Sequence, residues 1–380
     1  MAEVLFWTAA SILAYVYVGY PFIVRVLASV AGKPVRCVAA QYPSITVIIS
    51  AYNEEKNIRA KIDHVLSLDY PAALLNIIVV SDASTDATDQ IVERCKPDRV
   101  ELLRIEGRRG KTACQNAAAE RARGEVLIFT DATTRIETSA FKAIVENFAD
   151  PKVGCVAGLL VYQGKGHNLT AAGGVSYWRY EVTLRLAESR LGTLIGVSGC
   201  LYAVRRQAYR PISLKLVSDF VIAMRMREQG LRTILEPRAI CFEDTLDQPR
   251  NEFSMRVRVA IRSIGALVEE RRFLNIFAYP LFAWQLWSHK VLRYFSPYWL
   301  LVTLVTCLIL SENPLYRAVL IVQSVAFGAG VAGFALQLDA RRHSLLSKPY
   351  YFLLTNLASL VATLRYLNGD RMVTWLPLRE

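Results

Sequence analysis

The stretch Gly124-Glu-Val-Leu-Ile-Phe-Thr-Asp-Ala-Thr-Thr134 decides the class of fold. Its central residues, 126–130, form a short apolar, β-prone run, which predicts a buried strand. Asp131 follows at once, where the strand would end in a loop. In an open α/β sheet, ligands bind beyond the carboxyl ends of the strands, so a carboxylate here is placed to hold a metal ion or a polar ligand. A strand-end aspartate also commonly caps a helix or begins a turn.

Three further strands are expected before this stretch. Residues 44–50 and 75–81 are apolar runs too short for helices, and residues 99–105 are expected to form a third strand. Stretches with helical character separate them. Because strands and helices alternate from residue 44 to residue 130, the sequence predicts an α/β fold with a mostly parallel sheet.

Polar residues follow the first two of these strands. Residues 51–55, Ala-Tyr-Asn-Glu-Glu, come after the first strand, where Asn53 is suited to cap the next helix. Asp86 also fits a helix cap, but Asp82 lies directly at the end of the second strand, as Asp131 does at the end of its own. This repetition favours a ligand site over unrelated caps.

A glycine-flanked basic turn, residues 107–111, opens the helix after the third strand. Its glycine spacing differs from that of a phosphate-binding P-loop. A basic turn at a helix N-terminus nevertheless suits an anion. The sequence leaves two interpretations of Lys111 open, an anion-binding residue or a solvated surface lysine.

The composition narrows the classes of function. The 380 residues include 45 lysines and arginines against 33 acids, a net charge of +12 that suits anionic lipid or a phosphorylated substrate. Nucleic acid ranks last, because no pattern of aromatic and basic residues typical of RNA binding is found. The seven cysteines include no Cys-x-x-Cys pair, which argues against a zinc site or a disulfide framework.

Apolar segments at both ends predict a membrane protein. Val4–Val24 is uncharged and long enough to span a bilayer, and the basic residues after it place the N-terminus outside and the next segment in the cytoplasm. Tyr294–Leu310 and Ala318–Leu338 are expected to span, whereas Phe273–Trp287 is expected to be interfacial or re-entrant. Tyr350–Leu367 contains polar residues, and the sequence leaves open whether it spans.

Four motifs together resemble the family-2 glycosyltransferases of the GT-A fold. The chain is most similar to their membrane-embedded branch, which includes cellulose, chitin, hyaluronan and poly-N-acetylglucosamine synthases. The resemblance covers roughly residues 44–310 and implies a Rossmann-like, mostly parallel GT-A sheet in the cytosol with transmembrane and interfacial helices. The motifs are Ser50–Glu55, Ser81–Asp86, Gly110–Asn116 and Thr130–Thr133.

The resemblance implies a nucleotide-sugar site. Ala51, Tyr52, Glu54 and Asp82 would hold the base and ribose, and Lys111 would lie near the base or the diphosphate. UDP is the expected nucleotide on the same basis.

A divalent cation, Mg²⁺ or Mn²⁺, is also implied by the resemblance. Asp131 corresponds to the first residue of the family's Asp-x-Asp motif, but the second aspartate is Thr133 here. Because a hydroxyl is a poorer ligand for such ions than a carboxylate, this departure weakens the expected metal site. The donor diphosphate could still bring the ion.

The resemblance also implies an acceptor side. Gly199 and Cys200 correspond to the family's acceptor-side glycine segment, and Trp178 could stack on a sugar or pack in the core. Asp219 matches the last residue of the Thr-Glu-Asp motif and would be the general base, which takes the proton of the acceptor hydroxyl. Its alternative role is to cap the helix that follows it.

Residues 255–259 correspond to the Gln-Arg-x-Arg-Trp motif of processive enzymes. Arg258 is retained and would neutralise the leaving diphosphate, or lie on a basic membrane-surface helix. The tryptophan is Val259 here, which favours a short or single addition over long-chain synthesis.

The sequence therefore predicts an inverting glycosyltransferase that is integral to a bacterial-type inner or plasma membrane, with a cytoplasmic catalytic domain. Its expected partners are a nucleotide-sugar donor, a glycan or lipid acceptor and membrane lipid. The alternative is a catalytically silent scaffold or partner subunit of a polysaccharide export system. The expected divisions are a transmembrane helix (1–36), a GT-A domain (40–250), interfacial helices (251–290) and a C-terminal transmembrane region (291–380).

Overall fold

The computed structural model of the chain describes residues 1–35, 41–95, 98–163, 168–246, 248–336, 340 and 344–372. These residues form two compact units. The sheet unit is built mainly from residues 31–163 and 188–243, and the helical unit from residues 1–30, 164–187 and 244–371. The predicted boundary at residues 36–40 lies outside the described residues.

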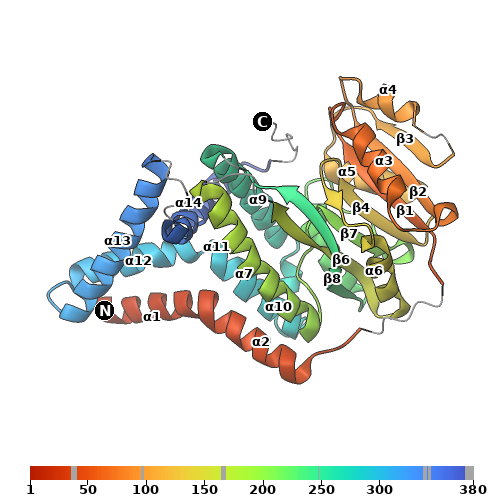
Figure 1. Cartoon of the computed structure of the whole chain (residues 1–380). Helices are drawn as coiled ribbons and strands as arrows, with labels where there is room; N and C mark the ends of the chain where they lie inside the picture. Colours follow the sequence, from red (N-terminus) through yellow and green to blue (C-terminus); the bar gives the residue numbers. More distant parts are fainter. Residues whose placement is uncertain are drawn as a thin grey trace. The chain divides into compact units, whose positions relative to one another are not determined.

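The sheet unit contains a single eight-stranded sheet flanked by helices (Figure 1). Its strands are β1 (Ile45–Ala51), β2 (Leu75–Asp82), β3 (Val100–Ile105), β4 (Val126–Asp131), β5 (Arg135–Ile136), β6 (Val153–Gln163), β7 (Leu201–Arg205) and β8 (Arg232–Asp244). Its helices are α3 (Ile58–Ser67), α4 (Thr88–Glu93), α5 (Lys111–Arg121), α6 (Ala140–Glu146) and α8 (Ser218–Glu228), with short 3₁₀ turns at Ala72–Leu74, Asn147–Ala149 and Arg206–Ala208.

The strand order is β3-β2-β1-β4-β7-β6-β8-β5. The first four strands pair in parallel, as the sequence predicts, and all seven residues of β1 are buried. A parallel strand covered on both faces accommodates such an uninterrupted apolar run. From β7 onward the described pairings are antiparallel, so the sheet is mixed.

The pairing of β4 with β7 positions the site. Because these two strands are antiparallel, the end of β4 at Thr130 lies opposite the start of β7 at Leu201. The residues just before β7 therefore lie beside Asp131, which ends β4.

The helical unit is all α-helical in its described part. Its main helices are α1 (Ala2–Ala14), α2 (Tyr20–Ala31), α7 (Leu169–Leu191), α9 (Pro249–Glu269), α10 (Pro280–Leu286), α11 (Leu292–Tyr294), α12 (Ser296–Ile309), α13 (Pro314–Leu336) and α14 (Ser347–Leu367). Shorter segments are the π-helical turns Tyr15–Gly19 and Trp287–Val291 and the 3₁₀ turns Arg271–Leu274 and Ser344–Leu346.

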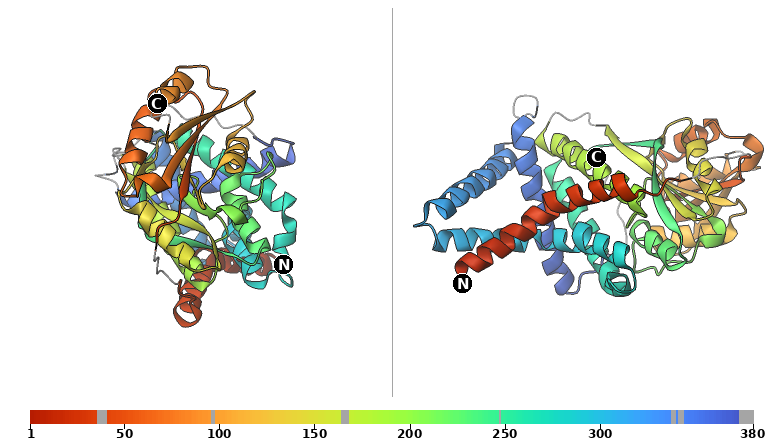
Figure 2. Two further views of the ribbon diagram at one scale, coloured as in Figure 1. Left: turned by 90° about the vertical axis from the view of Figure 1, so that its right-hand side faces the viewer. Right: turned by 90° about the horizontal axis from the view of Figure 1, so that it is seen from below.

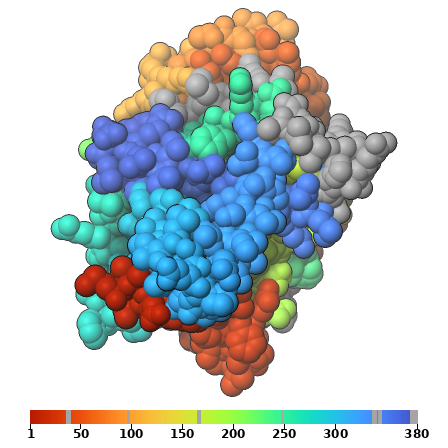
Figure 3. All heavy atoms as spheres, turned by 90° about the vertical axis from the view of Figure 1, so that its left-hand side faces the viewer, coloured from red at the N-terminus to blue at the C-terminus, as the bar shows by residue number. Residues whose placement is uncertain are grey.

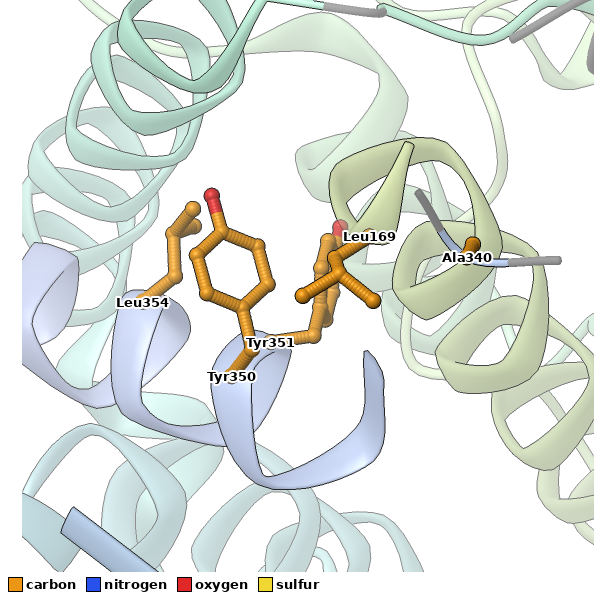
Figure 4. Close-up of a cluster of buried hydrophobic side chains, with 5 residues drawn as sticks. All are labelled: Leu169, Ala340, Tyr350, Tyr351 and Leu354. Atoms are coloured by element: carbon orange, nitrogen blue, oxygen red, sulfur yellow. The ribbon is translucent and has the colours of Figure 1, made fainter. Parts of the chain in front are cut away.

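Two packing contacts hold the ends of this unit together. Helix α1 lies along α12, and Phe6 packs its ring edge against Tyr316 with 4.9 Å between centroids (Figure 3). Helix α14 packs on α9, and its residues Tyr350 and Tyr351 join Leu169 of α7 in a buried cluster (Figure 4).

Two helices of the described chain are long and apolar enough to cross a membrane, Ala2–Ala31 and Pro314–Phe334. The first continues through the π-helical turn (Figure 2). A third span is possible if Pro280–Tyr294 and Ser296–Ile309, which meet at 56°, form one broken span. Helix α14, whose role the sequence left open, does not meet this criterion among the described residues.

Candidate active site

The loop before α5 is held in place by Asp82. This carboxylate, fully buried at the end of β2, accepts hydrogen bonds from the backbone N–H groups of Arg109 (2.8 Å) and Gly110 (3.0 Å). Gly110 has a φ of 90°, a conformation that side chains disfavour, so a glycine is needed at this turn. Asp82 thereby fixes the backbone just before Lys111, the first residue of α5, at the carboxyl ends of the strands.

Lys111 connects β4 to the segment before β7. Its ammonium contacts the Asp131 carboxylate and donates a hydrogen bond to the Gly199 carbonyl oxygen at 3.2 Å. Burial would lower the pKa of Lys111, but Asp131 and Asp219 together raise it above its ordinary value. The ammonium is therefore charged at neutral pH, and Lys111 is a component of the site, so its interpretation as a solvated surface lysine is wrong.

Gly199 lies between this lysine and Asp219. A Cβ atom placed on Gly199 would stand 3.0 Å from both Asp219 Oδ2 and Lys111 Nζ. The absence of a side chain thus allows the two charged groups to approach one point. Asp219 is the second residue of α8, whose N-cap position is Val217 and carries no side-chain cap bond, so the capping interpretation of Asp219 is wrong.

A third strand end contributes Glu243. Ligand atoms of Asp131, Cys200 and Glu243 lie within 4.8 Å of one another. Thr134 Oγ1 donates a hydrogen bond of 2.8 Å to Glu243. Our sequence reasoning missed Glu243, although a local signal was available, because β8 ends in two acids, Glu243 and Asp244, as β2 and β4 end in aspartates.

The donor set of this cluster fits a divalent cation through its two carboxylates. Burial and the nearby Asp131 raise the pKa of Glu243, as expected where two like charges meet with little water. A cation between them would relieve this repulsion, and carboxylate oxygens suit Mg²⁺ or Mn²⁺. Burial and the two acids raise the pKa of the Cys200 thiol, which makes it a poor ligand for such ions. Thr133 is exposed, and its part in metal binding stays a prediction.

The loop after β1 interlocks with the loop after β2. Asn53 adopts a φ of 52°, and its Oδ1 accepts a hydrogen bond of 2.7 Å from the backbone N–H of Thr85. Helix α3 begins only at Ile58, so the capping interpretation of Asn53 is wrong. Tyr52 carries the guanidinium of Arg108 over its ring at 3.7 Å.

The remaining predicted nucleotide residues also lie at this edge of the sheet. Ala51 is the buried last residue of β1, and Glu54 is buried and accepts a hydrogen bond of 2.8 Å from Asn57 Nδ2. Asp86 accepts a hydrogen bond of 3.0 Å from the backbone N–H of Thr88, the first residue of α4, but the N-cap position of this helix is Ala87 and not Asp86.

Two predicted site residues belong to the helical unit. Trp178 lies in α7 under the guanidinium of Arg185, with 5.8 Å between that group and the ring centroid. Arg258 lies in α9 and is partly buried. Their roles toward the acceptor and the leaving diphosphate stay predictions.

Residues 46–212 match the Glycosyl transferase family 2 profile. The chain carries a family 2 glycosyltransferase domain. The match covers most of the sheet unit, including Asp82, Lys111 and Asp131, and it confirms the family that the strand-end motifs indicated.

Curated relatives of this family 2 domain include poly-β-1,6-N-acetyl-D-glucosamine synthases. The protein of Staphylococcus epidermidis is 24% identical over 270 residues, which cover 67% of this chain and 65% of that protein. The protein of Staphylococcus aureus strain COL is 24% identical over 264 residues, 66% and 64% of the two chains. The chain thus matches just under two thirds of the length of these relatives.

A solved structure shares the fold of the whole chain. The mannosyltransferase PcManGT from Pyrobaculum calidifontis, solved with GDP-Man and Mn²⁺, superposes with a TM-score of 0.72 at 24% identity. The superposition covers 95% of this chain and 99% of that one. It confirms the predicted GT-A fold.

Proposed function

We propose that this family 2 domain is an inverting glycosyltransferase, which moves a sugar from a nucleotide-sugar to a glycan or lipid acceptor at the cytoplasmic face of a membrane. One observation carries the proposal. Asp219, Lys111 and, through Lys111, Asp131 converge on the position of Gly199, where a side chain would collide with two of them. The Asp219 carboxylate can accept a proton from an attacking hydroxyl, and the Lys111–Asp131 pair lies beside it at the end of β4. This arrangement suits attack of a hydroxyl on an activated sugar.

In this mechanism Asp219 is the general base. Its Oδ2 takes the proton of the acceptor hydroxyl while the hydroxyl oxygen forms a bond to the anomeric carbon. The bond between that carbon and the diphosphate oxygen breaks, and the nucleoside diphosphate leaves with the electron pair. A single displacement of this kind inverts the anomeric centre.

Asp131 and Glu243 would hold the divalent cation, with Glu243 supplying the carboxylate that Thr133 lacks. Such a cation supplies charge stabilisation to the diphosphate as it leaves. Lys111 is held by Asp131 and Gly199, so its ammonium is oriented at the same strand ends without rearrangement.

The donor sugar is the finer part of this proposal. The curated relatives make a polymer of N-acetylglucosamine, which supports UDP-N-acetylglucosamine as the first donor to try. Val259 in place of the tryptophan of processive enzymes supports a short or single addition.

A donor screen tests the proposal. The purified full chain in detergent is incubated with labelled nucleotide-sugars, with and without Mn²⁺, and released nucleoside diphosphate is measured. Turnover of one donor, lost in Asp219→Asn, is the expected result. Nucleotide binding without turnover in the presence of glycan and lipid acceptors would favour the catalytically silent scaffold, and a long polymer ladder would contradict single addition.

A further inference from the structure

A cavity of about 630 Å³ lies within the helical unit. Its walls come from α7, α9, α14 and the segment around α11, with Tyr17 from the N-terminal helix. None of these residues belongs to the candidate active site. The volume falls in the range of small-molecule sites in proteins.

The polar lining of this cavity is strongly basic. Four basic side chains line it, and none of the described lining residues is acidic. The basic residues are Arg256, Lys290, Arg293 and Lys348.

Two acids outside the lining, Glu181 and Glu252, bond to basic residues of the cavity wall. Glu181 accepts hydrogen bonds from Arg293 (2.8 Å) and bonds to His289 (2.7 Å). Glu252 pairs with Arg256 at 2.8 Å. The described lining of the cavity therefore carries four basic side chains and no acid, so the surface that faces the cavity is positively charged.

Arg293 presents unsatisfied donors in this region. Its Nη1 binds Glu181, but its Nε and Nη2 are buried and have no hydrogen-bond partner among the described residues. Buried guanidinium donors without acceptors are costly, and two oxygens of a phosphate are spaced to accept the two parallel N–H bonds of such a group. Tyr17, Tyr180 and Tyr294 add hydroxyl groups to the lining.

Part of the remaining lining is apolar. Val259, Pro349 and Phe352 line the cavity beside the basic residues, and α14 packs against α13, a helix apolar enough to cross a membrane. A cavity that is lined by both basic and apolar side chains among such helices matches an amphiphile with an anionic head. Basic pockets between membrane helices bind lipid head groups in this way.

We propose that this cavity binds the phosphate-bearing head group of an anionic lipid, with Arg293 and Lys348 contacting the phosphate. The site goes beyond the proposed function, because it requires no sugar transfer by the sheet unit. It differs in chemistry from the acid-rich strand ends, so the two proposals can fail separately.

Binding of short-chain lipids to the full chain in nonionic detergent tests this site. Dihexanoyl phosphatidic acid, dihexanoyl phosphatidylcholine and inorganic phosphate are titrated, and bound ligand is counted by native mass spectrometry. We expect phosphatidic acid to bind much more tightly than the other two. Lys348→Gln, at an exposed position, should weaken it about fivefold, which corresponds to about 1 kcal/mol for one charge near an anionic lipid.

Two further variants isolate the cause. Arg293→Lys keeps the positive charge beside Glu181 but removes the Nε and Nη2 donors, and it should also weaken phosphatidic acid binding. Arg271→Gln removes an exposed charge of the same unit outside the cavity and should change nothing. Melting temperatures check that each variant is folded.

Three outcomes would overturn the proposal. Equal affinity for inorganic phosphate would identify a soluble phosphate site, equal affinity for phosphatidylcholine would remove the role of charge, and equal losses in Lys348→Gln and Arg271→Gln would remove the cavity. Nucleotide binding is measured in the same preparations. Lipid binding without nucleotide binding would defeat the proposed function alone, and the reverse would defeat the cavity alone.

Discussion

The two units gather charge in opposite ways. In the sheet unit, Asp131 and Glu243 meet at the ends of β4 and β8, the ammonium of Lys111 contacts Asp131, and Asp219 at the start of α8 lies near the same lysine. In the helical unit, four basic side chains line one cavity and the acids stand behind its wall.

The difference in charge between the two regions indicates which kind of ion each of them would bind. An acid-rich site, even with the ammonium groups of Lys111 and Lys61 beside it, is suited to an incoming cation, whereas a cation-rich cavity is suited to an incoming anion. Neither arrangement is explained by stability alone, since clustered like charges destabilise a fold unless a partner compensates them. The charge balance of each unit therefore indicates its ligand class before any ligand is known.

The largest expected effect is the loss of transfer activity on replacement of Asp219, the proposed general base. Asp219→Asn keeps the shape of the side chain but removes the base, so transfer should fall roughly 10²–10⁴-fold while nucleotide binding stays unchanged. Initial rates of nucleoside diphosphate release with donor and acceptor measure this. Asp63→Asn, at an exposed residue of the same unit paired only with Arg59, is the control and should keep full activity. A variant at Asp219 that retained wild-type rates would exclude it as the base.

A second buried cation of the sheet unit should be visible as a pH dependence. Lys61 is almost fully buried and donates hydrogen bonds to Thr130 Oγ1 (3.0 Å) and the Thr134 carbonyl oxygen (2.5 Å). Burial lowers its pKa from 10.5 to about 8. Between these values the unfolded chain binds more protons than the folded one, so the free energy of unfolding rises with pH in this window.

The test compares wild type with Lys61→Met, because other titrations cancel in the difference. Relative to the variant, wild type should gain up to about 3 kcal/mol of stability between pH 8 and 10.5, the equivalent of the lowered pKa. Melting temperatures across this range measure it. If the melting temperatures of the two proteins changed with pH in the same way, burial of the Lys61 ammonium would not reduce the free energy of unfolding, and the prediction would be wrong.

The metal hypothesis depends on Glu243 and is tested by replacement of single oxygen ligands. Glu243→Gln should weaken Mn²⁺ binding in the presence of nucleoside diphosphate about tenfold, about 1.4 kcal/mol, because one carboxylate ligand is lost. Electron paramagnetic resonance of free Mn²⁺ measures the affinity. Glu106→Gln, at a side chain that is 90% exposed, is the control.

The same titration sharpens the choice between Glu243 and Thr133. Thr133→Ala should leave Mn²⁺ affinity unchanged if Glu243 is the second protein ligand. A loss in Thr133→Ala with no loss in Glu243→Gln would reverse the assignment.

The smallest expected effect concerns the open point at Gly199. In Gly199→Ala the new methyl group meets Asp219 Oδ2 and Lys111 Nζ at 3.0 Å, and both are side-chain ends that can shift slightly. Transfer should fall about fivefold, about 1 kcal/mol, with an unchanged melting temperature. Gly328→Ala in α13, where a Cβ meets nothing within 4 Å, should be neutral. A Gly199→Ala variant with full activity would mean that the convergence is not needed for transfer.

The parallel half of the fold could be predicted because its signals are local. The strands β1, β2 and β4 are short, mainly apolar runs, and Asp82 and Asp131 are the last residues of β2 and β4. The antiparallel half was not predicted, because nothing in the sequence marks which strand pairs with β4. For the same reason Glu243 was missed, since it lies 112 residues beyond Asp131 and reaches it only through the sheet.

Errors at single residues came from backbone and burial that the residue type does not reveal. Asn53 is a good cap by type, but its positive φ turns it toward Thr85. Lys111 lies in a basic, glycine-flanked turn, which in a sequence looks like an exposed loop. Only the fold places its ammonium between Asp131 and Gly199. Lys61 was not singled out, because a lysine in an amphipathic helix usually lies on the solvent side.

The contact between α1 and α12 has a consequence for biosynthesis. The two helices are separated by 281 residues, from Ala14 to Ser296, which include the whole sheet unit. At 5–20 residues per second, a ribosome needs on the order of 15–60 s to make that interval. Throughout this time the N-terminal helix exists without its neighbour. If this helix spans a membrane, it must be stable there alone, and its long apolar sequence meets that requirement before any tertiary contact forms.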